Sequence, residues 1–168
     1  MGNIIALDLS MSNTGVAIFD DKGQCKELFS IDTHKDKTHP LKLRNIEKAM
    51  RKIKKKYKPE LILIEEAFTR FNKSTQALYK VRGIAELIFY NIEQICYAST
   101  TVRKTVCGKG NIKKEELRNF ILENYKNIEF GDLDQSDAFG LALCYFKKEV
   151  NHNVEKDLQE GNSNKGID

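Results

Sequence analysis

The sequence lacks the features that mark membrane, secreted and zinc-binding proteins. No apolar run approaches the roughly 20 residues that a membrane-spanning helix needs. The chain starts on a strand pattern, without a charged stretch and an apolar core before it, so we expect no secretory signal. The four cysteines have no C-x-x-C spacing and the three histidines have no ligand spacing, so we expect buried thiols instead of zinc. These absences predict a cytoplasmic protein that binds no membrane.

Length and charge favour one domain with a weak preference for polyanions. The chain has 168 residues, 40% of them hydrophobic and 31% charged, with a net charge of +4. Its last 18 residues carry two lysines against four acidic side chains and show no apolar periodicity. We therefore expect a domain over residues 1–150 and a disordered or frayed polar tail over 151–168. No internal repeat is visible.

Apolar periodicity predicts five strands and five helices in an α/β fold. The first three strands are joined by short turns and should form an antiparallel meander, whereas helical crossovers between the later strands favour parallel pairing. The expected strands are 4–7, 15–19, 26–31, 61–64 and 92–97. The expected helices are 42–58, 75–90, a short helix with a glycine-containing turn over 101–110, 113–124 and 137–146. This order predicts a mixed five-stranded sheet with helices on both faces.

Acidic side chains stand at the ends of three of these elements. Asp8 ends the first apolar strand, Glu65 and Glu66 follow another, and Asp134 and Asp137 open the last helix. Carboxylates supplied by several elements are the oxygen ligands that Mg²⁺ takes, and a pair of ions can clamp a phosphoryl displacement. Glu65 and Glu66 point to opposite faces if the strand runs through both, so at most one of them joins such a site.

The aspartates also have ordinary structural explanations. Asp134 and Asp137 lie three residues apart, as in a helix-capping arrangement, although Asp132 could be the cap and leave both free. Asp8 could hydrogen-bond the backbone of the polar turn that follows it. Acidic residues at the ends of all three elements are much less often a coincidence than an acidic residue at the end of any one of them.

Basic residues give candidate DNA contacts. The lysine-rich helix 42–58 is more often a solvated surface than a binding face. A better group surrounds the glycines Gly108 and Gly110, where backbone amides could also meet phosphate. It consists of Arg103, Lys104, Lys109, Lys113 and Lys114.

A second candidate tract directly follows the acidic strand end. It holds Arg70 and Lys73, with Phe68 and Phe71 beside them. A phenylalanine here could stack on an unpaired base, although a core position is about as common for such a residue.

The sequence resembles the RuvC Holliday junction resolvases, particularly their small phage-encoded relatives. The resemblance covers residues 3 to 147 and depends on several ordered motifs. They are Ile5-Ala6-Leu7-Asp8 with Thr14-Gly15, Ile64-Glu65-Glu66-Ala67-Phe68, Arg82-Gly83, Val102-Arg103-Lys104-Thr105-Val106-Cys107-Gly108 and Asp134-Gln135-Ser136-Asp137-Ala138.

The resemblance implies an RNase H-like fold and a homodimer that nicks four-way DNA junctions symmetrically. It implies two Mg²⁺ ions per site, with Mn²⁺ able to substitute, and no small-molecule cofactor. The implied catalytic residues and metal ligands are Asp8, Glu65, Asp134 and Asp137. It also places Phe68 near the crossover point, and Arg103 and Lys114 at phosphates. Leu9-Ser10 replaces the Pro-Gly of the cellular enzymes, which favours the phage-type branch.

Three rival functions share part of this pattern. An RNase H-type nuclease acting on RNA or an RNA–DNA hybrid would share the metal, the carboxylates and the fold. An ATP-binding domain of the actin and sugar-kinase type could use Asp8 with Thr14-Gly15, but the chain shows no second glycine-rich phosphate loop. An inactive junction-binding module would not need all four acidic residues.

Overall fold

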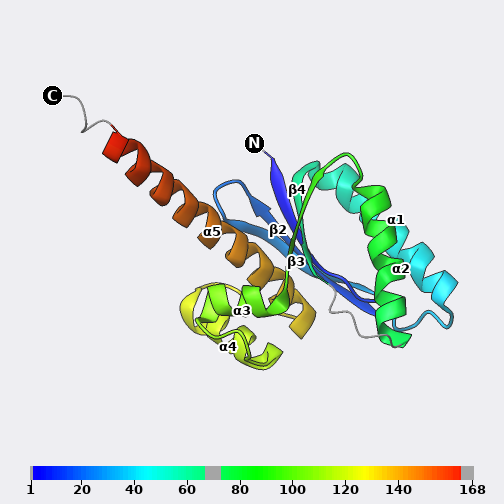
Figure 1. Ribbon diagram of the computed structural model, residues 1–168. Helices are drawn as coiled ribbons and strands as arrows, with labels where there is room; N and C mark the ends of the chain where they lie inside the picture. Colours follow the sequence, from blue (N-terminus) through cyan, green and yellow to red (C-terminus); the bar gives the residue numbers. More distant parts are fainter. Residues whose placement is uncertain (1, 67–72, 164–168) are drawn as a thin grey trace.

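A computed structural model describes residues 2–66 and 73–163, with side chains placed up to residue 149. Within these residues, five strands form one sheet and five helices are present. Helices lie on both faces of the sheet (Figure 1). In chain order the elements are β1 (Asn3–Asp8), β2 (Asn13–Asp20), β3 (Cys25–Asp32), α1 (His39–Tyr57), β4 (Pro59–Glu65), α2 (Lys73–Ile88), β5 (Glu93–Tyr97), α3 (Ser99–Cys107), α4 (Lys114–Asn124) and α5 (Leu133–Ser163).

The sheet is mixed, as the sequence predicts. Its strand order is β3-β2-β1-β4-β5. Strands β1, β2 and β3 form the antiparallel meander, while β4 pairs parallel to both β1 and β5. The parallel pairs follow the two crossovers through α1 and α2, because a short turn cannot return a chain to run in the same direction.

Each face of the sheet carries its own apolar core. Alternation along β1 sends Ile4 and Ala6 to one face and Ile5 and Leu7 to the other. Helices α3, α4 and α5 cover the first face, and α1 and α2 cover the second (Figure 1). Continuous apolar runs in β1 and β4 are therefore explained by burial on both sides.

Helix α1 begins and ends where local chemistry dictates. Thr38 caps its N-terminus by accepting from the amide of Leu41, and Pro40 occupies the first turn, where no amide donor is needed. It ends at Tyr57, and the next residue, Lys58, caps it with a left-handed backbone at a φ of 46°, directly before Pro59. Most of its lysines and arginines are exposed, whereas Lys42 and Lys54 are half-buried and donate to Ser12 and to the Ile88 carbonyl oxygen.

The backbone of α5 is helical as far as Ser163, and the disordered or frayed polar tail over 151–168 stays a prediction. One expectation differs from the structure. Cys96 is exposed on β5, so the expectation of buried cysteines is wrong there, while Cys144 is buried. Within the described residues, no helix has the length and apolar character to cross a membrane.

Candidate metal centre

Asp8 and Glu65 end two adjacent parallel strands, β1 and β4. In the register of this pair, Ala6 lies opposite Leu63, and both belong to the core beneath α3, α4 and α5. Asp8 and Glu65 follow these residues by two positions, so both carboxylates point to the same face. Glu66 lies one position further and is exposed. Strand alternation therefore places Glu65, and not Glu66, beside Asp8.

The turn after β1 is closed by Thr14. The Thr14 hydroxyl donates to the carbonyl oxygen of Ser10 at 2.9 Å and accepts from the Ser10 amide at 3.1 Å. The Asp8 carboxylate instead accepts from the ammonium of Lys114 at 3.2 Å. The turn therefore does not depend on Asp8, and the structural explanation of that carboxylate as a turn former is wrong.

Asp132 caps helix α5 and leaves the two later aspartates free. Its Oδ1 accepts from the amide of Gln135 at 2.8 Å, which is the usual N-cap bond. Although burial opposes it, hydrogen bonds from Ser30 and Asn13 hold the pKa of Asp132 below its ordinary value. Asp134 therefore lies within the first turn of α5, where its carboxylate is not needed for capping.

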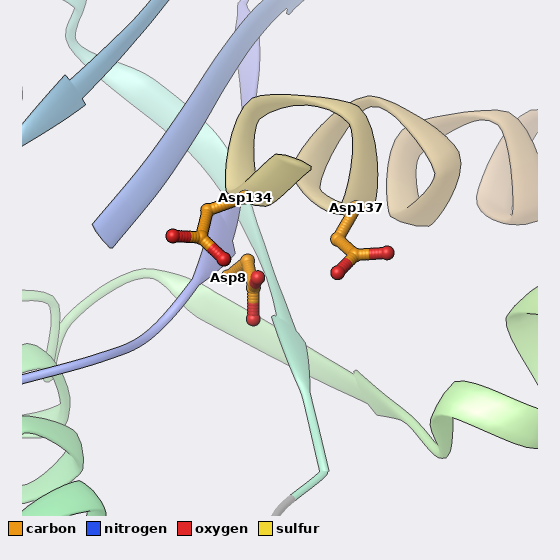
Figure 2. A group of neighbouring side chains, drawn as sticks. All are labelled: Asp8, Asp134 and Asp137. Atoms are coloured by element: carbon orange, nitrogen blue, oxygen red, sulfur yellow. The ribbon is translucent and has the colours of Figure 1, made fainter. Parts of the chain in front are cut away.

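Three of the four predicted acidic residues converge. One carboxylate oxygen from each of Asp8, Asp134 and Asp137 lies within 4.8 Å of the other two. Figure 2 shows Asp134 and Asp137 on the first turns of α5, with Asp8 approaching from the end of β1. Glu65 is outside this group of three but close enough that Asp137 raises its pKa, after the larger effect of burial.

Lys114 lies among these carboxylates. Its ammonium is 3.2 Å from Asp8 Oδ2 and 3.2 Å from Asp134 Oδ1, and it also contacts Asp137 Oδ2. The residue begins α4, so packing of α4 against α5 determines where its side chain reaches. The sequence predicts Lys114 as a phosphate contact, and its ion pairs with the acidic cluster were not expected.

The cluster carries more negative charge than its one central lysine balances. Burial raises the pKa of Asp8 well above its ordinary value, Lys114 opposes this shift, and the neighbouring carboxylates add to it. Burial likewise raises the pKa of Asp137, again against the effect of Lys114. Although burial opposes it, proximity to Asp8 and Asp137 raises the pKa of Lys114, so the ammonium stays charged. The site therefore favours additional positive charge.

The donor set fits a hard divalent cation. Asp137 is only 3% exposed, and Lys114 is the one side chain of the described residues in ionic contact with its buried Oδ2. Three carboxylate oxygens within 4.8 Å of one another, supplied by β1 and α5, match what Mg²⁺ or Mn²⁺ takes from proteins. Asp8, Asp134 and Asp137 could hold the metal, with Glu65 next to them.

The predicted DNA contacts fall into three groups. Arg103 on α3 is half-buried and near enough to lower the pKa values of Glu65 and Asp137, against the larger effect of burial. Lys104, Lys109 and Lys113 are exposed around the same α3–α4 segment. The third group comprises Lys73, exposed at the start of α2 beside an open hollow of about 830 Å³, and Phe68 and Arg70, which lie outside the described residues.

Sequence reasoning missed the residues that hold the first turn of α5 in place. Asn13 Nδ2 donates to Asp132 Oδ2 at 3.0 Å and to Asp134 Oδ2 at 2.8 Å, and Ser30 Oγ donates to Asp132 Oδ2 at 2.6 Å. Gly15 provides the close approach, because a Cβ there would overlap the backbone carbonyl of Asp134. The available signal was spacing, since Asn13 lies two positions before Gly15 and shares its face of β2.

Comparison with known proteins gives one consistent family. The family model described as crossover junction endodeoxyribonuclease RuvC matches residues 4–145. RuvC of Ehrlichia canis is 33% identical over 149 residues, covering 85% of this chain and 95% of the relative. RuvC of Gluconobacter oxydans is 28% identical over 151 residues, covering 86% of this chain and 90% of the relative.

Solved structures share the fold at low sequence identity. RuvC of Thermus thermophilus in complex with a Holliday junction substrate has a TM-score of 0.75 at 16% identity, covering 89% of this chain and 95% of that one. The yeast mitochondrial Holliday junction resolvase Ydc2 has a TM-score of 0.68 at 10% identity, covering 95% and 86%. The predicted RNase H-like fold is thus confirmed. From the extent of the family match, the chain belongs to the crossover junction endodeoxyribonuclease RuvC family.

Proposed function

We propose that this chain is a divalent-metal-dependent endonuclease that nicks four-way DNA junctions and related branched DNA. The observation that carries the proposal is the convergence of carboxylates from β1 and α5, with Glu65 on β4 beside them. Asp8, Glu65, Asp134 and Asp137 are the proposed catalytic residues and metal ligands. The T. thermophilus relative was solved with a Holliday junction substrate, which supports this class of DNA.

The roles of the chain's own groups follow from their charge and position. The four carboxylates would hold two Mg²⁺ ions, or Mn²⁺ in their place, which when bound supply an activated water and neutralise charge at the scissile phosphate. Arg103 and Lys114 lie beside the carboxylates and would bind the DNA backbone near them. The wider proposed contact surface consists of Phe68, Arg70, Lys73, Lys104, Lys109 and Lys113.

We further propose that the active form is a homodimer formed through α2. Tyr79, Gly83 and Leu87 recur at four-residue intervals on one face of this helix, and Leu87 is 69% exposed. A Cβ added at Gly83 meets no described atom within 4 Å, so the close packing that a helical glycine permits is not used within the chain. Two such faces could pack together, and two active sites would then cut two strands.

The central experiment compares wild type with Asp8→Asn on a labelled synthetic four-way junction. We expect two symmetric nicks from the wild-type protein in Mg²⁺ and none without metal. Asp8→Asn should abolish cleavage and keep junction binding, because the substitution removes a ligand charge and preserves shape. An unchanged cutting rate in Asp8→Asn would defeat the assignment.

The RNase H-type rival is tested in the same reaction. An RNA–DNA hybrid of matched length replaces the junction, and the proposal requires the junction to be cut much faster. Junction binding without cleavage by the wild-type protein in Mg²⁺ or Mn²⁺ would instead favour an inactive binding module. ATP binding by the isolated chain would favour the actin-like rival.

Leu9-Ser10 after the first aspartate supports placement in the phage-type branch. For such an enzyme we propose cytoplasmic action on recombining or replicated DNA, with relaxed sequence preference at the cut. Mapping of nicks on junctions of several sequences tests this preference.

A further inference from the structure

We propose that Asn13 is a positioning residue that fixes the orientation of the Asp134 carboxylate for metal binding, an inference that rests on the proposed function. Asn13 is the first residue of β2 and belongs to neither the acidic cluster nor the basic surface. Its side-chain amide nevertheless connects the cap of α5 to one of the proposed ligands.

The orientation of this amide is determined by its partners. Asn13 Nδ2 lies 3.0 Å from Asp132 Oδ2 and 2.8 Å from Asp134 Oδ2. Both partners are carboxylate oxygens, which accept and cannot donate when ionised, so the NH₂ group must face them. Its two N–H bonds match two acceptors. The amide therefore joins two like charges that would otherwise repel across the first turn of the helix.

The other side chains bonded to this network, Ser30 and Gln135, hold Asp132 at the N-cap of α5, and neither hydrogen-bonds the Asp134 carboxylate. Ser30 on β3 donates to Asp132 Oδ2 at 2.6 Å and accepts from Gln135 Nε2 at 3.1 Å. Asp132 Oδ1 in turn accepts from the backbone N–H of Gln135 at 2.8 Å. In this network of side-chain hydrogen bonds, Asn13 alone also reaches a carboxylate of the acidic cluster.

The two oxygens of Asp134 consequently have different environments. Oδ2 is held by Asn13, while Oδ1 lies 3.2 Å from the Lys114 ammonium at the cluster. A neutral amide holds one oxygen without adding a positive charge that would repel a cation. Groups that orient a metal ligand in this way are typically worth 10- to 100-fold in metal affinity, about what we expect of Asn13.

The test is a titration of the metal-free protein with Mn²⁺ alone, comparing Asn13→Ala with Ser30→Ala. Both variants remove a hydrogen bond to Asp132, but only Asn13→Ala removes the bond to Asp134. We expect Asn13→Ala to bind Mn²⁺ about 10- to 100-fold more weakly and Ser30→Ala to bind it like wild type. Thermal melting of both proteins shows whether any loss comes from unfolding. Equal Mn²⁺ affinity in the two folded variants would overturn the proposal.

Cleavage kinetics give a second readout that a purely structural role would not reproduce. For Asn13→Ala, the Mg²⁺ concentration for half-maximal junction cleavage should rise, while the rate at saturating Mg²⁺ returns toward wild type. A lower rate at saturating Mg²⁺ with no change in the half-maximal concentration contradicts the proposal.

Asp134→Asn separates failure of this inference from failure of the proposed site. If Asp134→Asn weakens Mn²⁺ binding and Asn13→Ala does not, Asp134 is a ligand and only the role of Asn13 is wrong. If Asp134→Asn leaves Mn²⁺ binding unchanged, the ligand assignment itself fails, and the inference with it. In the double variant we expect no loss beyond that of Asp134→Asn, because the oriented group is already altered.

Discussion

Gly15 on β2 lies directly against the backbone carbonyl of Asp134 at the start of α5, so close that a Cβ would overlap it. Backbone atoms cannot move aside as a flexible side chain can. The absence of a side chain at Gly15 therefore determines how near the first turn of α5 comes to the ends of β1 and β2, and thereby where Asp134 is presented.

Gly15→Ala should displace the first turn of α5 and weaken the metal site. We expect a loss of about 1–3 kcal/mol in the free energy of unfolding, typical of overpacking. Denaturant unfolding and Mn²⁺ titration measure the two effects. Gly83→Ala in the Leu87→Glu background, which removes the proposed dimer face, is the control, since a Cβ at Gly83 meets no described atom within 4 Å and the helix should gain up to about 1 kcal/mol. Equal effects of the two substitutions would show that close approach at Gly15 is unimportant.

The pH dependence of the free energy of unfolding should reveal the cost of burying the ionised Asp8 carboxylate. Burial raises the pKa of Asp8 above its ordinary 3.8, so the folded state keeps a proton that the unfolded state has released. The contribution of Asp8 to the free energy of unfolding is therefore fully present below pH 3.8. It is lost as the pH rises from 3.8 through the raised pKa of the folded state. In metal-free buffer we expect Asp8→Asn to melt at a higher temperature than wild type at neutral pH, with the difference shrinking below pH 3.8.

Metal should reverse this order. At 100 times its dissociation constant, a bound ion adds about 2.7 kcal/mol to the folded state, and Asp8→Asn should lose most of that gain. Melting curves in EDTA and in Mg²⁺ give both results. A variant that is less stable than wild type at neutral pH without metal would mean that Lys114 already compensates the Asp8 charge fully.

Lys114→Met should bind Mg²⁺ more tightly and cleave more slowly. The ammonium lies against three carboxylates and repels an incoming cation. Since one unit charge at about 4 Å is worth a few kcal/mol at an effective dielectric of 20, we expect affinity to rise at least about tenfold. Cleavage should fall, because the proposed phosphate contact is lost.

Isothermal titration with Mg²⁺ and junction cleavage at saturating metal separate these two effects of Lys114→Met. Lys113→Met is the control, because Lys113 is the exposed neighbour and no ion pair joins it to the acidic cluster in the described part of the chain. Weaker Mg²⁺ binding by Lys114→Met would mean that the lysine supports the metal site and does not compete with the ion.

Leu87→Glu should separate the proposed homodimer without unfolding the subunit. Leu87 is 69% exposed, so a charge there costs little within one chain but would be buried between two α2 faces. Sedimentation measures the assembly state, and nick mapping should show cuts on one strand at a time. Leu122→Glu, at another exposed leucine on α4, is the control. A wild-type protein that sediments as a monomer at all concentrations contradicts the dimer.

The sequence was sufficient for the order of strands and helices because the apolar periods are clear and the breaks between them are polar. The apolar pattern by itself could not choose between Glu65 and Glu66, because residues 61–64 are all apolar and conceal which face each position occupies; the family resemblance alone implied Glu65. The physical reason for that choice is the register with β1, where Ala6 lies opposite Leu63. Apolar periodicity cannot reveal this pairing between strands that are distant in the sequence.

The residues around the site were harder to predict for a related reason. Asn13 precedes Thr14-Gly15 in a polar segment and resembles an ordinary turn residue. Its role depends on contact with Asp132 and Asp134, more than 100 positions away. The basic character of Lys114 was visible, but its position among the carboxylates depends on packing between α4 and α5.

Truncation after Val150 tests the expected domain boundary. The buried side chains of α5 in the described structure end at Cys144, and the helix then extends away from the sheet (Figure 1). Removing residues 151–168 should therefore change the free energy of unfolding by no more than about 0.5 kcal/mol, as for surface changes, and leave cleavage intact. Truncation after Ala142 is the contrast, because it removes Leu143 and Cys144 from the core and should cost several kcal/mol. If truncation after Val150 also unfolds the protein, residues 151–168 contribute contacts that their polar composition does not reveal. The domain would then extend beyond residue 150.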